Sequence, residues 1–421
     1  MKPIQLVGRA KAGIATFAVL SVTWSALSQA AAPPSAENET GLFRAPWNRE
    51  ILGTGAKRPD AVQWAWGEAN MIKTRQVRLN PLGLSRINQA RLKQGLRPLS
   101  VQADTLAAHG AEVAADPTFQ PKEAVSMGEV GLPAAVDNSA LKYFPPIRSQ
   151  GSLNSCAQFS AVYYTLTHMT AMARDWDAKN GGDAFRFSPK WTYNMLNNGA
   201  NAGTWHYDAY AIAMKHGLAT WAEFPYDANY RAWCLNPAVW ENAIRVRAAQ
   251  SGKVLDVDTD AGLQQLKQLL VNGYVLNYAT YISSWVSKTV ANDPSTTADD
   301  PYVGKSCAYM VNGTSGGHTM AIVGYNDDIW VDINSDGLVQ PSEKGALRVA
   351  NSWGTSWNDA GFGWIAYQAV RTRNPAWPSE GIFWYDEATW ATALPSYRPQ
   401  VLAAFTLNHL KRNQLLVSLG I

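Results

Sequence analysis

The chain has 421 residues, of which 47% are hydrophobic, and its formal net charge at pH 7 is +3. A chain of this length and hydrophobicity can bury the core of one large domain and still has room for a smaller one. The small net charge and the scattered positions of the charged residues exclude a strongly basic surface, so we expect no nucleic-acid partner.

The first 30 residues are typical of a secretory signal peptide. Three basic residues precede an apolar run from Ala12 to about Leu27, and a group of small residues follows it. The run is short for a membrane span, which needs about 20 residues, although an uncleaved membrane anchor is the alternative. We therefore expect a secreted or periplasmic protein with no stable membrane span after residues 1–30 are removed.

Residues 31–130 are predicted to form an N-terminal extension. Its first part, residues 33 to about 60, is rich in alanine, proline and glycine and is typical of a linker. The part from about 61 to 125 carries apolar residues near helical spacing, such as Ile87 and Leu92. At the other end of the chain, residues 392–421 are predicted to be a tail that contains a short amphipathic helix.

Three cysteines occur, Cys156, Cys234 and Cys307. Because the number is odd, an exported chain keeps at least one free thiol, and a free thiol in an oxidising compartment needs a reason to exist. If Cys156 is the free thiol, the other two can form a single disulfide.

The sequence around Cys156 predicts a nucleophile. Gly151, Asn154 and Ser155 are turn or N-cap residues, and the apolar residues that follow recur at helical spacing. Cys156 is therefore expected in the first turn of a buried helix, where unpaired N–H groups favour an anion and lower the pKa of a thiol. Gln150 lies upstream, where its side-chain amide can donate to an oxyanion together with the backbone N–H of Cys156. The alternative is a buried structural cysteine.

Two later strands supply the partners of this nucleophile. His318 opens an apolar strand directly after two glycines, unlike the other five histidines, which stand in helical or loop contexts. A second strand ends at Asn351, whose side chain can accept the second ring N–H of His318 and fix its tautomer. Trp353 can cover that hydrogen bond. Cysteine, histidine and asparagine in this chain order form a nucleophile, a base and an orienting group.

These motifs closely resemble those of the papain-like cysteine peptidase family, over about residues 131–391. Three stretches carry the resemblance: Gln150-Gly151 with Ser155-Cys156 and Phe159-Ser160, then His318 with Ala321-Ile322-Val323-Gly324-Tyr325, then Asn351-Ser352-Trp353-Gly354. The resemblance implies an α+β fold with a helical lobe that begins at the Cys156 helix and an antiparallel sheet or barrel lobe that carries His318 and Asn351. It also implies hydrolysis of peptide or protein substrates through a thioester on Cys156, without a catalytic cofactor. We expect a monomer.

The resemblance also suggests substrate-binding positions. Gly203 and Thr204 stand where the family keeps a glycine pair whose backbone hydrogen-bonds the substrate, and Gly317 and Trp353 adjoin the catalytic histidine and asparagine. We expect these four residues to contact the substrate.

The chain departs from the family at several places, and these departures bear on specificity. Leu153 stands where the family usually has a disulfide-bonded cysteine, Ala157 where it usually has tryptophan, and Thr204 replaces the second glycine of the pair. No catalytic group is lost. An amidase or transpeptidase on the same fold and a non-catalytic peptide-binding relative are the alternatives, although a relative that has lost activity commonly lacks the nucleophilic cysteine.

The resemblance also implies a role for residues 31–130. They stand where the family carries an inhibitory propeptide, which runs backwards through the cleft and is removed on activation. A permanent N-terminal extension is an equally compatible interpretation.

A twelve-residue stretch between the His and Asn strands fits the pattern of an EF-hand calcium loop. Oxygen-bearing side chains stand at positions one, three and five, glycine at six and glutamate at twelve. The alternative is an ordinary Asp-Gly turn. We predict a structural Ca²⁺ that braces the connection between His318 and Asn351, with six ligands: Asp332, Asn334, Asp336, Leu338, Gln340 and Glu343.

Overall fold

The computed structural model describes residues 42–44, 51–99 and 131–402. The predicted signal peptide, residues 1–30, and the predicted tail helix lie outside these residues. All the helices and strands below belong to one compact unit, Thr40–Gln400. A second unit combines Met1–Glu39 with Val401–Ile421, and of it only two residues are described.

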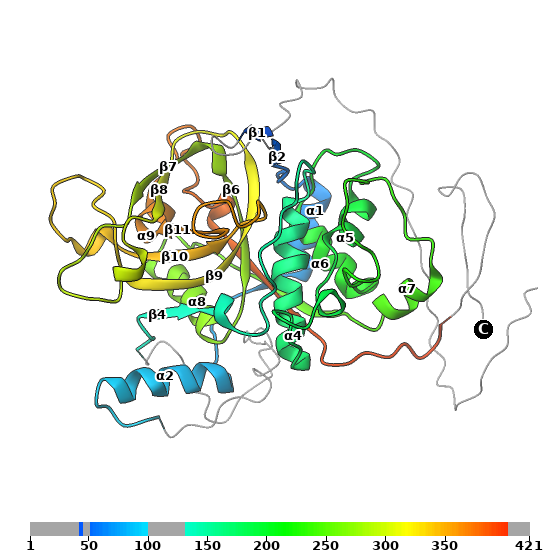
Figure 1. Ribbon diagram of the computed structural model, residues 1–421, viewed down its shortest axis with the longest axis horizontal. Helices are drawn as coiled ribbons and strands as arrows, with labels where there is room; N and C mark the ends of the chain where they lie inside the picture. Colours follow the sequence, from blue (N-terminus) through cyan, green and yellow to red (C-terminus); the bar gives the residue numbers. More distant parts are fainter. Residues whose placement is uncertain (1–41, 45–50, 100–130, 403–421) are drawn as a thin grey trace, which may run out of the picture. The chain divides into compact units, whose positions relative to one another are not determined.

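A sheet of ten strands forms one half of the compact unit, in the order β3-β5-β12-β6-β9-β10-β11-β8-β7, with β4 paired to β9 (Figure 1). The ten strands are β3 (Ile72–Lys73), β4 (Ala135–Asp137), β5 (Ala248–Val254), β6 (Leu276–Tyr281), β7 (Trp285–Thr289), β8 (Ser306–Val311), β9 (Gly317–Trp330), β10 (Lys344–Ala350), β11 (Phe362–Ala366) and β12 (Ala388–Ala393). The N-terminal strands β1 (Leu42–Arg44) and β2 (Ile51–Gly53) form a separate two-stranded sheet.

The sequence predicts an antiparallel sheet, and most pairs are antiparallel. Two are not, because β11 pairs in parallel with β8 and β3 in parallel with β5. The sheet is therefore mixed, and the α+β prediction is confirmed. The β3–β5 pair has a second consequence: it adds a strand of the N-terminal extension to the edge of the main sheet.

Some helices form a group beside the sheet, and others pack against its strands. They are α1 (Ala61–Asn70), α2 (Pro81–Lys93), α3 (Cys156–Gln158), α4 (Thr167–Arg174), α5 (Pro189–Leu196), α6 (His206–Lys215), α7 (Pro237–Ala243), α8 (Asp260–Val271) and α9 (Tyr367–Arg371). Figure 1 shows α1, α5, α6 and α7 together on one side of the molecule, opposite the strands β7–β11. These helices surround their own hydrophobic cluster, which includes Trp191, Trp205 and Tyr210.

The helix that begins at Cys156 stands between the two halves. α3 continues without a break into a π-helical segment, Phe159–Leu166, and then into α4. The π-helical segment contacts both β9 of the sheet and α6 of the helical lobe. Its residues are buried on all sides, so the sequence-based assignment of one apolar face understates its burial. The helix ends at Asp175, which adopts a left-handed conformation (φ 54°).

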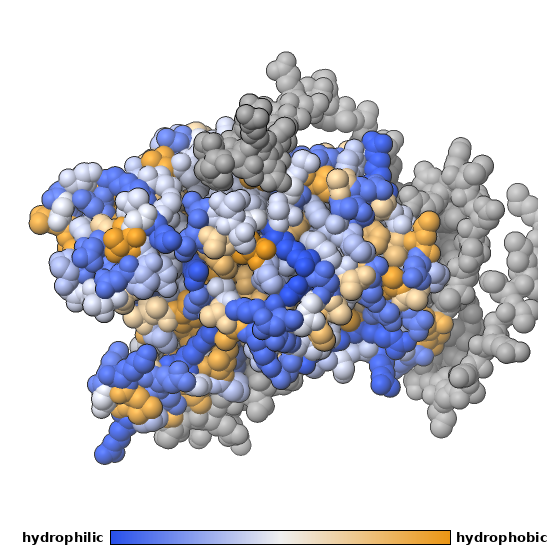
Figure 2. Space-filling view, viewed as in Figure 1, coloured by the Kyte–Doolittle hydropathy of each residue, from blue (hydrophilic) through white to orange (hydrophobic). Residues whose placement is uncertain are grey.

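Apolar side chains on the face shown in Figure 2 form small patches separated by polar residues. Most large apolar side chains of the described residues are buried in the core clusters. Within residues 51–99 and 131–402, no helix is long and apolar enough to cross a membrane.

Candidate active site

Cys156 lies at the first position of α3, as predicted, and its side chain is fully buried. The preceding Ser155 does not cap the helix with its side chain; its hydroxyl instead hydrogen-bonds the Tyr226 hydroxyl at 2.7 Å. Burial raises the pKa of the Cys156 thiol to about 11, although hydrogen bonds from the backbone of Thr319, Gly55 and Ala157 oppose this rise. The sequence-based expectation of a lowered thiol pKa is thus wrong for this state, because burial outweighs the helix N-terminus.

His318 and Asn351 meet as the sequence predicts. The Nε2 atom of His318 lies 2.7 Å from Oδ1 of Asn351, and both residues are buried. The two side chains come from neighbouring antiparallel strands, since His318 is in β9 and Asn351 follows β10 directly. The Trp353 ring lies over the imidazole with its centroid 4.6 Å away, so it covers the histidine–asparagine hydrogen bond.

The second ring nitrogen of His318, Nδ1, is buried and has no hydrogen-bond partner among the described residues. Burial lowers the pKa of this imidazole to about 4, although the hydrogen bond to Asn351 raises it. The Cys156 thiol and the His318 imidazole are therefore both neutral at neutral pH, and Cys156 is hydrogen-bonded to the backbone of Thr319, the residue directly after His318.

Gln150 is held by hydrogen bonds to Ser352, the residue directly after Asn351. Its backbone N–H donates to the Ser352 carbonyl at 2.8 Å, and its side-chain Oε1 accepts from the Ser352 hydroxyl. The bond to Oε1 fixes the orientation of the amide, so that Nε2 is available as a donor. Nε2 donates to the Leu153 carbonyl at 2.7 Å and to the carbonyl of Gly53 at 3.1 Å.

Residues 53–57 of the N-terminal extension pass directly over this site. The Gly53 carbonyl accepts from Gln150 Nε2 and from Trp353 Nε1, both at 3.1 Å. The backbone N–H of Gly53 donates to the Gly151 carbonyl at 2.9 Å, and that of Ala56 donates to the Gly317 carbonyl at 3.0 Å. The segment thus makes main-chain hydrogen bonds on both sides of Cys156.

Thr204 binds the same segment through two further main-chain hydrogen bonds. Its N–H donates to the Gly55 carbonyl at 3.0 Å, and its carbonyl accepts from the N–H of Lys57 at 3.3 Å, so Ala56 forms a parallel bridge with Thr204. The Thr204 hydroxyl is not directed into the cleft, because it accepts from Gln158 Nε2 at 2.9 Å. Threonine therefore replaces the family's glycine here without blocking the backbone that binds the segment.

Several glycines make this close approach possible. A Cβ atom on Gly55 would lie 2.1 Å from the Asn154 carbonyl oxygen, and one on Gly53 would lie 2.2 Å from that of Leu153. On the opposite wall, a Cβ on Gly203 would meet the Gly55 carbonyl at 2.2 Å, and Gly203 also has a φ of +79°. The segment and the cleft wall therefore fit each other only with glycine at these positions.

The four residues predicted to bind substrate, Gly203, Thr204, Gly317 and Trp353, all adjoin this segment. What the sequence did not reveal is the segment itself, because residues 51–58 resemble a linker in composition. The only local signal is the pair Gly53 and Gly55, and alternating glycines can equally mark a flexible turn.

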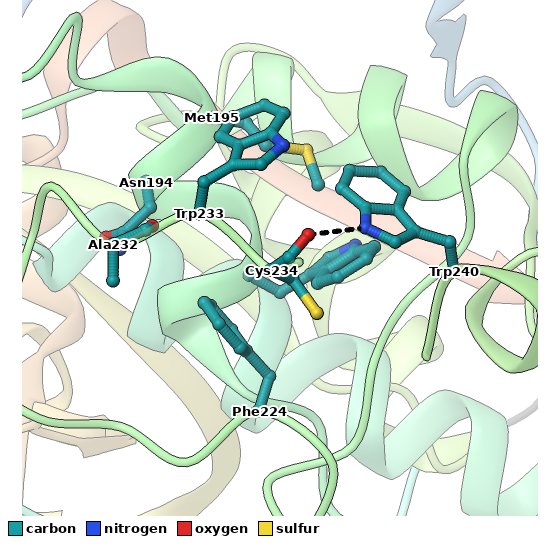
Figure 3. A pocket seen from close by; sticks show the side chains of 8 residues that line it. Asn194, Met195, Phe224, Ala232, Trp233, Cys234 and Trp240 are labelled. Carbon is teal, nitrogen blue, oxygen red and sulfur yellow. Dashed lines mark hydrogen bonds between the residues drawn. The ribbon is translucent and has the colours of Figure 1, made fainter. Parts of the chain in front are cut away.

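The three cysteines are all free thiols in the structure, so the possible Cys234–Cys307 disulfide is not formed. Cys307 lies in β8 and is buried in a cluster of the sheet. Cys234 belongs to the helical lobe and lines an aromatic pocket in which Trp240 Nε1 donates to its carbonyl at 2.9 Å (Figure 3). This pocket contains no residue of the predicted catalytic set. Its lining residues are Trp191, Asn194, Met195, Phe224, Ala232, Trp233, Cys234 and Trp240.

The predicted calcium loop, residues 332–343, does not have the geometry of a metal site. Glu343, the expected bidentate ligand, is buried, and its carboxylate accepts from the backbone N–H groups of Ile333 at 2.9 Å and Asn334 at 3.1 Å. The Lys288 ammonium donates to the Asp332 carbonyl at 2.7 Å and so brings a positive charge to the loop. Within the described parts of the chain, no three metal-ligating His, Cys, Asp or Glu side chains lie close enough to hold an ion.

The other predicted ligands of this loop bind one another or face solvent. Asp336 accepts from Gln340 Nε2 at 2.6 Å and from Asn334 Nδ2 at 3.0 Å, and Leu338, whose backbone carbonyl is the expected ligand, is an exposed residue. Both Asp332 oxygens accept backbone N–H groups, from Asp336 at 3.1 Å and from Gly337 at 3.0 Å. The residues present do not fit calcium in this arrangement, and the structure favours the alternative of a turn closed by its own hydrogen bonds.

The comparison with protein families gives one match to this chain. The family model described as papain family cysteine protease matches residues 132–374. The matched range contains Gln150, Cys156, His318 and Asn351, and it begins after the segment that lies in the cleft. No curated protein matches the chain.

Several solved structures are similar to the chain at low identity. The Amb a 11 cysteine protease, a major ragweed pollen allergen, in its proform is 18% identical with a TM-score of 0.41, over 63% of this chain and 66% of that chain. The recombinant stem bromelain precursor is 19% identical with a TM-score of 0.41, over 62% and 70% of the two chains. Xylellain, a cysteine protease from Xylella fastidiosa, is 17% identical with a TM-score of 0.41, over 62% and 86%. The chain therefore spans slightly less than two thirds of the ragweed protein's length.

Proposed function

We propose, from the premise that this chain belongs to the papain family of cysteine proteases, that it is the inactive precursor of a secreted cysteine peptidase, held closed by its own N-terminal extension. The observation that carries the proposal is the passage of residues 53–57 over Cys156, with main-chain hydrogen bonds to Gly151, Gly317 and Thr204. No substrate can reach the thiol while these bonds persist, because Cys156 and His318 are both fully buried.

The direction of the segment supports inhibition rather than cleavage. Ala56 pairs in parallel with Thr204, whose position in the family belongs to the backbone that holds the substrate. The family resemblance implies that an inhibitory segment runs backwards relative to a substrate. When a peptide runs in the reverse direction, the N–H and the carbonyl of each peptide bond exchange places. The carbonyl carbon is then not positioned for attack by the thiol.

The extension is also held in place at a distance from the cleft. Glu68 in α1 pairs with Lys253 of β5 at 2.6 Å, and Lys253 is almost fully buried. The Asn80 amide donates to the Asn272 carbonyl at 2.7 Å at the start of α2. These contacts show that the extension is firmly docked; that it is a propeptide removed on activation, and not a permanent extension, is part of the proposal.

After release, the same groups would perform acyl transfer. Cys156 gives its proton to His318 Nδ1, and the thiolate attacks a peptide carbonyl. Gln150 Nε2, which holds the Gly53 carbonyl in the closed state, and the Cys156 N–H then stabilise the oxyanion. His318, oriented by Asn351, protonates the leaving amine and then activates water to hydrolyse the thioester. Gly203, Thr204, Gly317 and Trp353 would hold the substrate backbone.

Labelling with a thiol-directed epoxide peptide mimic tests this proposal. The full chain should label slowly, and the folded chain should label quickly after limited proteolysis has removed the residues before about 131, whereas Cys156→Ala should not label in either form. Absence of labelling in the processed wild-type protein would contradict the peptidase assignment. Equal labelling of full and processed chains would contradict the inhibitory role alone. Analysis of the products with and without an added amine separates hydrolysis from transpeptidation.

Two further features remain proposals from the sequence. The predicted signal peptide supports secretion or export to the periplasm, and detection of the processed protein outside the cytoplasm would test it. We propose that the protein is a monomer, which sedimentation of the full chain would test.

A further inference from the structure

The Arg58 side chain, one residue beyond the segment that covers Cys156, fills a pocket of complementary charge and shape. Its guanidinium makes a bidentate ion pair with Glu380, with N–O distances of 2.8 and 2.6 Å. Its Nε atom donates to the Tyr281 hydroxyl at 3.2 Å. The guanidinium also lies over the rings of Trp377, Trp384 and Tyr385, at 4.6 to 4.9 Å from their centroids.

The pocket is part of the peptidase domain and not of the extension. Tyr281 ends β6, and Trp384 and Tyr385 belong to the turn Trp384–Asp386 that precedes β12. Glu380 is held by main-chain hydrogen bonds to Trp377 at 3.1 Å and Asn374 at 2.9 Å. The pocket would therefore remain when the extension is removed, and Arg58 would leave it.

The pocket adjoins the catalytic histidine. Tyr281 pairs with Gly317, the residue directly before His318. A Cβ atom on Gly317 would lie 3.1 Å from the Trp384 ring, so the glycine forms a wall shared by the cleft and the pocket. Residues 53–57 of the extension run from Gln150 past Cys156 to Gly317 and Thr204. The next residue, Arg58, places its side chain in the pocket.

Removal of Arg58 would leave a carboxylate without its partner. The Glu380 side chain is only 6% exposed. A buried carboxylate without a cation is costly, and a guanidinium between aromatic rings restores both the ion pair and the cation–π contacts. A peptide substrate that lies in the cleft can supply this group from one of its own side chains.

We propose that this pocket, formed by Tyr281, Glu380, Trp377, Trp384 and Tyr385, is a specificity pocket for arginine, and that the processed enzyme cleaves peptides that carry an arginine at one fixed position near the scissile bond. This inference rests on the proposed function, because it assigns a substrate class to that active site. Arg58 occupies the pocket in the precursor and so mimics the substrate side chain.

The geometry distinguishes arginine from lysine. Two parallel N–H···O bonds to one carboxylate, together with stacking on several rings, require a planar guanidinium. A lysine ammonium can form the ion pair but has neither the fork nor the flat surface. We therefore expect arginine to be preferred over lysine, and lysine over leucine.

The test is a cleavage profile of the folded full chain after activation by limited proteolysis. A complex mixture of peptides is digested, and the residues around each cleaved bond are identified by mass spectrometry. We expect arginine to be enriched at a single position, with kcat/KM for an arginine peptide about 10- to 100-fold above that of the leucine peptide, as charge-assisted hydrogen bonds imply. Glu380→Gln should remove most of this preference, and the exposed control Glu241→Gln should retain it.

The outcomes separate this inference from the proposed function. Active enzyme without arginine enrichment, or with a profile unchanged by Glu380→Gln, would overturn the arginine pocket and leave the peptidase assignment intact. No cleavage and no epoxide labelling would overturn the peptidase assignment itself. If Glu380→Gln does not fold, Trp377→Ala removes a ring that is 42% exposed and should reduce the preference for arginine over leucine several-fold without abolishing cleavage.

Discussion

Two short segments of this chain, residues 53–58 and residues 332–343, differ in where their polar groups find partners. The first has the composition of a linker, yet its backbone and its Arg58 side chain bind residues of the peptidase domain more than ninety positions away in sequence, among them Gln150 and Glu380. The second has a strong metal-loop pattern, yet its carboxylates bind backbone N–H groups of the same loop.

The difference shows what a local pattern does and does not determine. A sequence motif states which donors and acceptors a segment offers, and the fold decides which partners they meet. The glycines of residues 53–57 offer only backbone, which is what a cleft lined by backbone groups binds. The acidic residues of the loop 332–343 offer carboxylates that could bind a cation. In the structure, backbone N–H groups of the same loop occupy these carboxylates, and the Lys288 ammonium binds a loop carbonyl.

The largest expected effect concerns the ionisation of Cys156. With the segment bound, burial raises the pKa of this thiol to about 11, so at pH 7 about one molecule in 10⁴ carries the thiolate. After processing, exposure to solvent and an ion pair with His318 lower the pKa of the Cys156 thiol, so the thiolate predominates at pH 7. Thiolate absorbance near 240 nm, taken as wild type minus Cys156→Ala, should be absent below about pH 10 in the full chain and present at pH 7 in the processed enzyme.

The subtraction removes the signals of the other two thiols, which are present in both proteins. A thiolate signal in the full chain at pH 7 would contradict this prediction, because it would mean that the bound segment does not keep the Cys156 thiol protonated.

A smaller effect is expected from Gly55→Ala in the full chain. The added Cβ would lie 2.1 Å from a backbone carbonyl that cannot rotate away, so the segment must shift. Overpacking of this kind costs about 1–3 kcal/mol, which corresponds to about a 5- to 150-fold rise in the population with an open cleft. The rate of epoxide labelling of the unprocessed chain should rise by the same factor.

Gly131→Ala provides the matched control, since a Cβ at Gly131 meets no atom within 4 Å. Equal labelling rates for wild type, Gly55→Ala and Gly131→Ala would show that the cleft is not closed by this segment.

The sequence was informative where function requires particular chemical groups in order. Cys156 at a helix start and His318 at a strand start follow from periodicity and flanking residues, and the pairing of His318 with Asn351 follows from the need of the imidazole for an orienting acceptor; the structure places the two on neighbouring strands. The sheet partners of β8 and β3 were not predictable, since parallel pairing joins strands far apart in the chain. The arginine pocket was also hidden, because its five residues are drawn from three separate places in the last third of the sequence and none forms a motif.

The smallest expected effect is that of calcium on the loop 332–343. The Lys288 ammonium binds the carbonyls of Asp332 and Ile333 at 2.7 and 2.8 Å, and Glu343 is satisfied by N–H groups of the loop. We therefore expect the Tm of the full chain to change by less than about 1 °C between chelator and excess calcium. Glu343→Ala should lower the Tm equally in both conditions, because it leaves the buried Trp330 indole N–H and the partly buried N–H groups of Ile333 and Asn334 without an acceptor, at a cost of about 1–3 kcal/mol.

Calcium binding would contradict this expectation in a recognisable way. A ligand at a hundred times its Kd stabilises the folded state by about 2.7 kcal/mol, and this would raise the wild-type Tm by several degrees. Glu343→Ala would then lose the calcium response as well as stability. That result would mean that the loop rearranges around an ion and that Lys288 leaves the carbonyls of Asp332 and Ile333. The EF-hand pattern in the sequence would then have identified the binding partner of these acidic residues correctly, in contrast to the hydrogen bonds of the structure.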